Sequence, residues 1–269
     1  MVIYRPIKVS NYRFNREGII MKEYFVCSDI HGFYDTFFTS LINAGFDYYN
    51  PNHYIIICGD IFDRGSQAKE LLKFLLEFQQ LGRLILIRGN HEDLLEACLE
   101  QLYARVNVSE HHWRNQTVDT IAQLTGLNKY DLMCGVYESD VLKDRLKPYF
   151  ELVSKAVDYY EIDNYIFVHG WIPVSCEGVY YTYDKDWRNA SKSAWGKARW
   201  YNGMDMAHNG IIEENKTIVC GHWHTGYGHY YLHNEGETQY DSFDVYIDKG
   251  IVALDACTAY SNKINIYKI

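Results

Sequence analysis

The sequence predicts an α/β fold built around a parallel sheet. Three apolar runs read as buried strands that end in polar residues, namely EYFVCSD (23–29), HYIIICGD (53–60) and RLILIRGNH (83–91). Helical patterns at 33–46 and 66–82 separate them. Strands and helices that alternate at a spacing of about thirty residues are typical of βαβ units, whose strands run parallel. Parallel sheets bind ligands beyond the carboxyl ends of their strands, so the polar residues after each run are the first candidates for function.

The spacing of apolar residues predicts the helices. The pattern at 66–82 has one apolar face and a helix end at Gly82; the face consists of Leu71, Leu72, Leu75, Phe78 and Leu81. A further helix is predicted at 92–106, where the apolar positions are Leu95, Cys98, Leu99 and Leu102. We expect the stretch from about 94 to 165 to form a helical insertion packed beside the sheet.

Two later apolar runs predict further strands that also end in histidine. YIFVHG (165–170) ends at His169, and TIVCGHWH (217–224) ends at His222 and His224. With 48% hydrophobic residues in 269, the chain has ample material for a core, and no linker, repeat or low-complexity tract divides it. We therefore expect residues 1–22 to be an N-terminal extension and 23–269 to be a single domain.

Charge and cysteine content exclude several classes of protein. A net charge of -9 argues against a broad nucleic-acid or anionic-membrane surface, and so against a nuclease. The chain has no apolar run long enough to span a bilayer, and its first eighteen residues lack the long apolar core and the small-residue cleavage site that are typical of a signal peptide. It has seven cysteines and no CxxC, and four of them lie in apolar runs as expected for buried thiols: Cys27, Cys58, Cys220 and Cys257. We therefore place the protein in the cytoplasm.

The five strand ends carry the residues of a metal site. Taken alone, Asp29 and His31 would fit a solvated loop in which Asp29 caps the following helix. Together, the strand ends bring carboxylates, imidazoles and an amide to one rim, where a single arginine, Arg64, cannot neutralise the buried carboxylates. A pair of divalent cations would. Mixed Asp, Asn and His ligands suit manganese, iron or zinc better than calcium.

The ordered series SDIHG, GDIFDRG, RGNHE, HG and GHWH resembles the calcineurin-like metallophosphoesterases, and GDIFDRG with RGNHE is closest to the phosphoprotein phosphatase branch of phage and bacteria. The resemblance covers residues 23 to 269 and includes a closing segment, 251–269, that is similar to the terminal strand pair of that branch. It implies a four-layer fold, in which two packed β-sheets are flanked by helices, with two metals on the rim.

Carried over position by position, the resemblance implies a ligand set. Asp29 and His31 match ligands of the first metal, Asp60 matches the carboxylate that bridges both metals, and the second metal takes Asn90, His169 and His222. His224 matches the second histidine of the broader superfamily's motif. We favour it as a ligand of the first metal over a role beside that site. We expect two divalent metal ions. Mn²⁺ is the preferred identity, and iron, zinc, cobalt or nickel are the alternatives.

The resemblance also implies the residues that act on the substrate. His91 matches a histidine that is not a ligand and would protonate the leaving alkoxide, while Asp63 would hold it charged. An ordinary turn aspartate is the alternative for Asp63. Arg64 would pair with the phosphate, with a structural ion pair as the alternative. A second basic residue is expected to contact the phosphate, and Arg199 is preferred to Arg188 and Lys197 for this role. The alternative for each of the three is a position on a solvated cationic face. Trp171, in HGW, is expected to reshape a pocket wall.

The sequence thus predicts a phosphatase that hydrolyses phosphate monoesters by direct attack of a metal-bridging hydroxide. The expected substrate is a phosphorylated protein, as for a serine/threonine phosphatase. The first alternative is a dinucleoside polyphosphate such as diadenosine tetraphosphate, or another small phosphate ester or nucleotide. A metal-bound scaffold without activity is the alternative from another class. Asp60, Asn90 and His91 argue against it, because binding alone requires none of the acid chemistry.

Overall fold

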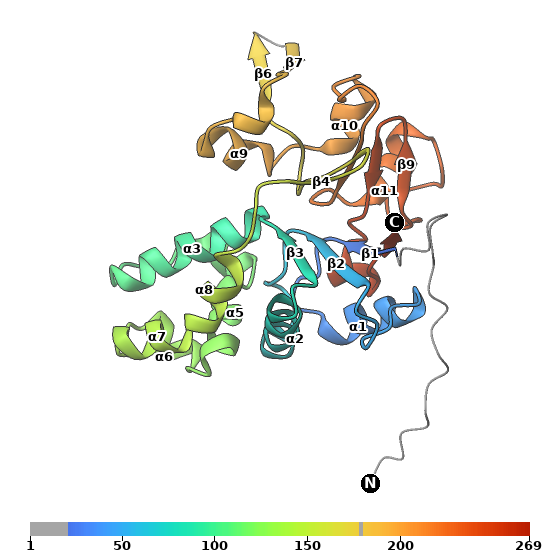
Figure 1. Ribbon diagram of the computed structural model, residues 1–269. Helices are drawn as coiled ribbons and strands as arrows, with labels where there is room; N and C mark the ends of the chain where they lie inside the picture. Colours follow the sequence, from blue (N-terminus) through green and yellow to red (C-terminus); the bar gives the residue numbers. More distant parts are fainter. Residues whose placement is uncertain (1–20, 178–179) are drawn as a thin grey trace.

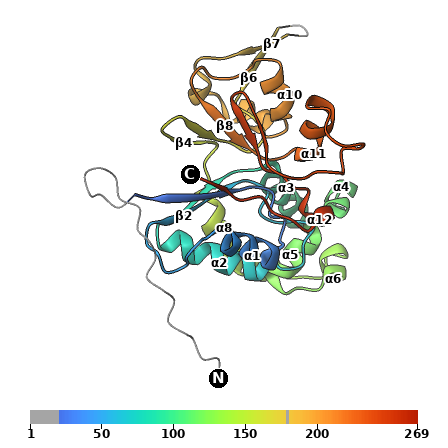
Figure 2. The same cartoon turned by 90° about the vertical axis from the view of Figure 1, so that its right-hand side faces the viewer.

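A computed structural model describes residues 21–177 and 180–269 of the chain. Two β-sheets lie face to face in the middle of the molecule, and helices cover the outer face of each (Figure 1, Figure 2). This order of helices, sheet, sheet and helices confirms the predicted fold class.

The first sheet contains the predicted parallel strands. Its order is β11-β1-β2-β3. β1 pairs in parallel with β2, and β2 with β3, whereas β11 is antiparallel to β1. The strands are β1 (Glu23–Cys27), β2 (His53–Cys58), β3 (Leu84–Ile87) and β11 (Tyr267–Lys268).

The second sheet has the order β4-β5-β8-β10-β9, with a parallel centre of β5, β8 and β10. Its strands are β4 (Tyr160–Ile162), β5 (Tyr165–Phe167), β8 (Thr217–Cys220), β9 (Tyr246–Asp248) and β10 (Ile251–Ala253). A separate pair is formed by β6 (Val174–Glu177) and β7 (Tyr180–Tyr183). The closing segment does hold two strands, but β10 and β11 lie in different sheets and do not pair with each other.

Both faces of the central strands are buried, which explains why their sequences are continuous apolar runs. Along β1, Val26 points into the layer between the sheets, while Phe25 and Cys27 pack against the outer helices. The layer between the sheets consists of Val26, Ile56, Cys58, Ile87, Phe167, Val219, Val252 and Leu254. This layer fixes the position of one sheet, and therefore of its strand ends, relative to the other.

Helices α1 (Tyr34–Asn43) and α2 (Ala68–Gln80) cover the outer face of the first sheet. Most of the predicted apolar face of α2 is buried, but Leu81 lies beyond the helix end and is 54% exposed. Gly82, with φ of +66°, turns the chain away from the helix. Leu81 therefore fits the apolar spacing of the sequence but does not belong to the buried face.

Between β3 and β4 the chain forms α3 (Asn90–Tyr103), α4 (Glu110–Arg114), α5 (Thr117–Thr125), α6 (Lys129–Met133), α7 (Ser139–Arg145) and α8 (Lys147–Val153). Helix α3 is the helix predicted at 92–106, and its predicted apolar positions are buried. Both α5 and α8 pack against α2. The cores of these helices form one cluster with the outer layer of the first sheet.

The outer face of the second sheet is covered by η1 (Trp187–Asn189), α9 (Lys192–Ala198) and α10 (Gly203–His208). The remaining short helices are α11 (Thr225–Tyr227), η2 (Gly228–Leu232) and α12 (Thr258–Ser261). Trp171 is 1% exposed in the core of this layer, and its indole N–H donates to the Ile211 carbonyl at 3.0 Å. The expectation that Trp171 forms a pocket wall is therefore wrong, because its ring fills the core.

The thiols of Cys27, Cys58 and Cys220 are buried and free, as their apolar surroundings predicted, whereas Cys257 is only half-buried. Cys257 follows the last apolar run in a turn that leads into α12. Across residues 21–177 and 180–269, no helix combines the length and the apolar character needed to cross a membrane.

Candidate metal centre

The carboxyl ends of strands from both sheets meet at one rim of the molecule. Asp29 follows β1, and Asp60 follows β2, in the first sheet, while His169 follows β5 and His222 follows β8 in the second. Polar contacts connect the sheets at this rim; among them, His169 Nδ1 lies 2.7 Å from the Cys58 carbonyl, and the His222 amide donates to Asp29 Oδ2 at 3.0 Å. The predicted residues therefore gather from strand ends that are far apart in the sequence.

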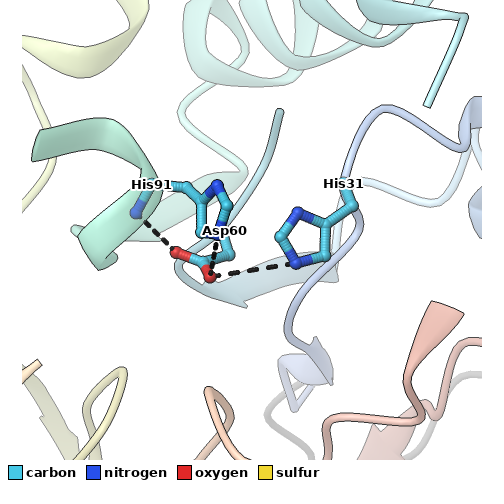
Figure 3. Close-up of side chains that lie close together, drawn as sticks. All are labelled: His31, Asp60 and His91. Atoms are coloured by element: carbon cyan, nitrogen blue, oxygen red, sulfur yellow. Dashed lines mark hydrogen bonds and ion pairs between the residues drawn. The ribbon is translucent and has the colours of Figure 1, made fainter. Parts of the chain in front are cut away.

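Two groups of ligand atoms share Asp60. His31, Asp60 and His91 place one ligand atom each within 4.8 Å of one another, and so do Asp60, His169 and His222. Asp60 Oδ2 lies 3.9 Å from His31 Nε2 and 3.8 Å from His91 Nε2 (Figure 3). Asp60 Oδ1 lies 3.2 Å from His169 Nε2. A carboxylate with imidazoles on both oxygens is suited to bridging two cations.

Hydrogen bonds fix which nitrogen of two imidazoles is free. His31 Nδ1 lies 2.9 Å from the Phe62 carbonyl, and His169 Nδ1 lies 2.7 Å from the Cys58 carbonyl. Because a carbonyl oxygen only accepts, both Nδ1 atoms carry a proton, so Nε2 is the atom of each ring that is available to bind a metal. His169 Nε2 faces Asn90 Oδ1, another acceptor, at 2.8 Å. Two acceptors that face each other are the arrangement that a cation stabilises.

Burial keeps two imidazoles neutral. Burial, reinforced by Arg64, lowers the pKa of His31 to about 3. Burial, reinforced by His169, lowers the pKa of His222 to about 4. Both rings are therefore neutral near pH 7, which is the form that binds a metal.

The pKa values of the two buried carboxylates, Asp29 and Asp60, shift in opposite directions. Burial, followed by the charges of Asp255 and Asp60, raises the pKa of Asp29 well above its ordinary value. Burial would also raise the pKa of Asp60, but the nearby histidines, His169 first, outweigh it and lower that pKa. Asp29 Oδ1 is buried and has no hydrogen-bond partner among the described residues. A set of carboxylate, amide and imidazole ligands fits a divalent ion such as manganese, iron or zinc.

The backbone at the rim adopts conformations that side chains rarely take. Left-handed φ angles between 51° and 73° occur at Asp29, His31, Asp60, Asp63, Arg64 and His222. Each such residue costs on the order of 1–3 kcal/mol, so surrounding bonds must hold it. Strain of this kind gathers at functional sites, where it aims side chains that an ordinary turn would point elsewhere.

One buried carboxylate, Glu92, supplies much of that support. Its Oε2 accepts N–H bonds from Gly89 at 2.8 Å and Asp60 at 3.1 Å, and its Oε1 accepts one from Ile61 at 2.9 Å. A Cβ at position 89 would lie 2.3 Å from Asp60 Oδ1, so only glycine allows this approach. Glu92 has no predicted role, although its place in RGNHE, directly after His91, was a signal.

The predicted proton donor and its partner are in contact. His91 Nδ1 lies 2.7 Å from Asp63 Oδ2. Burial would lower the pKa of His91, but the charge of Asp60 and the bond to Asp63 outweigh it, so that pKa is raised. The Arg64 guanidinium lies 3.0 Å from His31 Nε2 and 3.3 Å from His91 Nε2, at the centre of the cluster. Distance alone also groups His91 with the first set of ligand atoms, so its role as a donor stays a prediction.

His224 stands outside both groups of ligand atoms. Its Nδ1 lies 2.8 Å from Asp255 Oδ2. Burial would lower the pKa of His224, but the bond to Asp255 outweighs it and raises the pKa to about 10. Asp255 is buried and was not predicted, although it directly follows the apolar run of β10 and thus carries the same signal as Asp29 and Asp60.

The structure gives the predicted basic residues other partners. Arg199 pairs with Asp93 at 2.7 Å and with Asp158 at 2.5 Å, so its contact with phosphate stays a prediction. The next residue, Trp200, is 51% exposed, and its ring centroid lies 5.6 Å from that of His222. Nothing in the sequence marks Trp200 as a neighbour of the rim.

Arg188, the other arginine considered, is held away from the rim. It pairs with Glu161 at 2.6 Å and with Glu213 at 2.9 Å. Its guanidinium also lies over the Trp187 ring. These contacts favour a structural ion pair for Arg188.

Comparisons with known proteins bear on the fold and on the family of the chain. Solved structures of similar fold include a cold-active protein tyrosine phosphatase, with 18% identity over 92% of this chain and 73% of that chain, and a TM-score of 0.52. A putative diadenosine tetraphosphatase has 13% identity over 93% and 94% of the two chains, and a TM-score of 0.45. A protein serine/threonine phosphatase from Saccharomyces cerevisiae has 16% identity over 75% and 61%, and a TM-score of 0.42.

The likeness to the cold-active phosphatase, at 18% identity, shows the fold alone. A search of the curated proteins finds no match. The family model of the calcineurin-like phosphoesterases, in contrast, matches residues 24–245, which include every predicted ligand. The chain therefore belongs to the calcineurin-like phosphoesterase family and is a metal-dependent phosphoesterase.

Proposed function

We propose that this phosphoesterase is a protein serine/threonine phosphatase that works with two divalent ions, preferably Mn²⁺. The observation that supports the two-ion centre is the position of Asp60, which belongs to both groups of ligand atoms, and the GDIFDRG and RGNHE motifs support the substrate class. The first ion would take Asp29, His31 and His224, the second Asn90, His169 and His222, and Asp60 would bridge them. The proposal takes residues 23–269 as one domain with a helical insertion, whose last helix, α8, ends at Val153, before β4 begins at Tyr160.

The bound ions would supply Lewis-acid activation of water and positive charge for the phosphate oxygens. The chain's own residues do the rest. Arg64 offers a planar guanidinium to the phosphate. His91 donates a proton to the departing serine or threonine oxygen, and Asp63 holds the imidazole in place from 2.7 Å. The buried free thiols of Cys27 and Cys58 favour a reducing, cytoplasmic compartment.

One observation favours a second candidate, a dinucleoside polyphosphate hydrolase. Trp200 presents a half-exposed indole beside His222, and such a ring can stack on a nucleobase. A flat aromatic face beside the phosphate site would serve a nucleotide better than a serine side chain.

The deciding measurement is the initial rate on a phosphoserine peptide and on diadenosine tetraphosphate, after chelation and restoration with manganese. Manganese-dependent turnover of the peptide with little turnover of the dinucleotide supports the proposal. The opposite preference supports the second candidate, a dinucleoside polyphosphate hydrolase. Inactivity on both, with two ions bound, supports the inactive scaffold.

The role of His91 is tested by His91→Asn. The variant should keep both ions and lose rate chiefly on poor leaving groups, by about 10²–10⁴-fold. A variant that loses an ion would show that His91 is a ligand.

A further inference from the structure

Two threonines of helix α5 reach across to the residue that holds His91. Thr117 Oγ1 donates to Asp63 Oδ2 at 3.0 Å, on the same oxygen that receives His91 Nδ1. The Asp63 amide donates to Thr120 Oγ1 at 3.0 Å. The two threonines are three residues apart and therefore share one face of the helix. Both are buried, at 0% and 1% exposure.

The Thr120 hydroxyl does not form the bond that threonines inside a helix usually form, and Thr117 is the first residue of its helix. A threonine inside a helix commonly donates to the carbonyl four residues earlier. Thr125, in the same helix, does so, with Oγ1 2.6 Å from the Ile121 carbonyl. Thr117 and Thr120 instead bond to Asp63, more than fifty residues away in sequence.

Helix α5 is a firm base for these contacts. Val118 and Ile121 are fully buried in the main core cluster. The helix packs against α2, α3, α4, α6 and α7. It is therefore held on several sides, and the hydroxyls that face Asp63 have a fixed position.

Asp63 requires such support. Its backbone has a left-handed φ of 73°, and its Oδ1 is buried with no hydrogen-bond partner among the described residues. Its side chain is located by two donors on Oδ2, His91 and Thr117. Without the Thr117 hydroxyl, only His91 would locate the carboxylate, and the two side chains could turn together.

We propose that Thr117 and Thr120 are positioning residues for the reaction, which hold Asp63 so that His91 stays aimed at the leaving oxygen. The inference rests on the proposed function, in which His91 is the proton donor. It assigns a role in the chemistry to a helix that brings no metal ligand. Thr117 acts through the side chain of Asp63, and Thr120 acts through its backbone.

The test is the rate of Thr117→Val on two substrates, 4-nitrophenyl phosphate, whose leaving group is good, and a phosphoserine peptide, whose leaving group is poor. Valine keeps the shape of threonine and removes the donor. We expect kcat on the peptide to fall by about tenfold, a part of the 10²–10⁴-fold that a general acid supplies. The kcat on 4-nitrophenyl phosphate should change by less than about twofold, and KM should stay constant for both.

Thr117→Ser, which keeps the hydroxyl, should restore the wild-type ratio of the two rates. Thr125→Val is the matched control from the same helix, because its hydroxyl bonds locally, and it should leave the ratio unchanged. If Thr117→Val fails to fold, Thr117→Cys replaces it and should give a smaller shift in the same direction, since a thiol is a weak donor.

Equal slowing of both substrates by Thr117→Val, or no slowing of either, would overturn the inference. His91→Asn, assayed beside it, separates this failure from that of the proposed function. If His91→Asn slows the peptide selectively and Thr117→Val does not, only the inference fails. If His91→Asn is not selective, the proton-donor role fails, and the inference fails with it.

Discussion

Replacing Glu92 by glutamine tests how far one buried carboxylate shapes the rim. Glu92 is 2% exposed and accepts three backbone N–H bonds, from Gly89, Asp60 and Ile61. Glutamine has nearly the same shape but only one acceptor oxygen. If that oxygen faces Gly89 and Asp60, the amide group meets the Ile61 N–H, and two donors oppose each other.

The expected loss follows from these bonds. A hydrogen bond to a charged group contributes about 1.5–3 kcal/mol, and Glu92→Gln loses one and weakens two. Burial, followed by the charge of Asp60, raises the pKa of Glu92, so the cost of keeping the carboxylate ionised offsets part of this. We expect the free energy of unfolding to fall by about 2–4 kcal/mol, against a typical total of about 5–15 kcal/mol.

Urea denaturation of the metal-free wild type and variant measures this loss. Glu96→Gln is the matched control, because Glu96 lies one turn further along α3, is partly exposed and pairs with Arg88 at the surface. Its loss should stay below about 1 kcal/mol. If Glu92→Gln and Glu96→Gln destabilise equally, the carboxylate does not support the rim and the reasoning is wrong. Isothermal titration with Mn²⁺ should also show weaker binding in Glu92→Gln alone.

Three further predictions concern the site itself. Asp60→Asn should lose both ions and all turnover above background, measured by elemental analysis and rate, because each ion depends on that side chain; a variant that keeps two ions would exclude Asp60 as the bridge. Arg64→Ala should keep both ions and lower kcat/KM by about 10–100-fold, the value of one charged hydrogen bond, and unchanged kinetics would remove Arg64 from the phosphate site. At pH 8, metal-free His224 should carry a proton, because its pKa is raised to about 10, so a metal that binds it must release that proton and bind more tightly as pH rises. Titration calorimetry in buffers of different ionisation enthalpy should show one proton fewer released by His224→Gln, and an unchanged count would place His224 outside the ligand set.

The candidate ligands could be singled out in the sequence because their signal is local. Asp29 and Asp60 each follow an apolar run, and parallel strands in one sheet bring such positions together. His169 and His222 show the same pattern in the second sheet, but nothing local in the sequence indicates that the two sheets face each other. That part of the prediction came from the resemblance alone.

The supporting residues could not be predicted, because their roles depend on contacts between distant segments. Thr117 and Thr120 read as ordinary polar positions in a short helix, and only packing shows that they face Asp63. The partners of Arg199 were hidden for the same reason, since Asp93 and Asp158 come from other elements. A motif identifies residues that do chemistry, but it does not identify the neighbours that aim them.

The centre joins the two sheets as well as binding its ions. Between the strands the contacts of the two sheets are mainly apolar, whereas at the rim the Cys58 carbonyl accepts from His169, and Asp29 accepts from the amide of His222. An ion that takes ligands from both sheets would bind well only when the sheets are packed in this register. Metal binding and the packing of the two sheets must therefore stabilise each other by the same free energy, whichever is measured. The apolar layer that contains Val26 and Val219 thus sets the ligand distances, although it includes none of the candidate ligands.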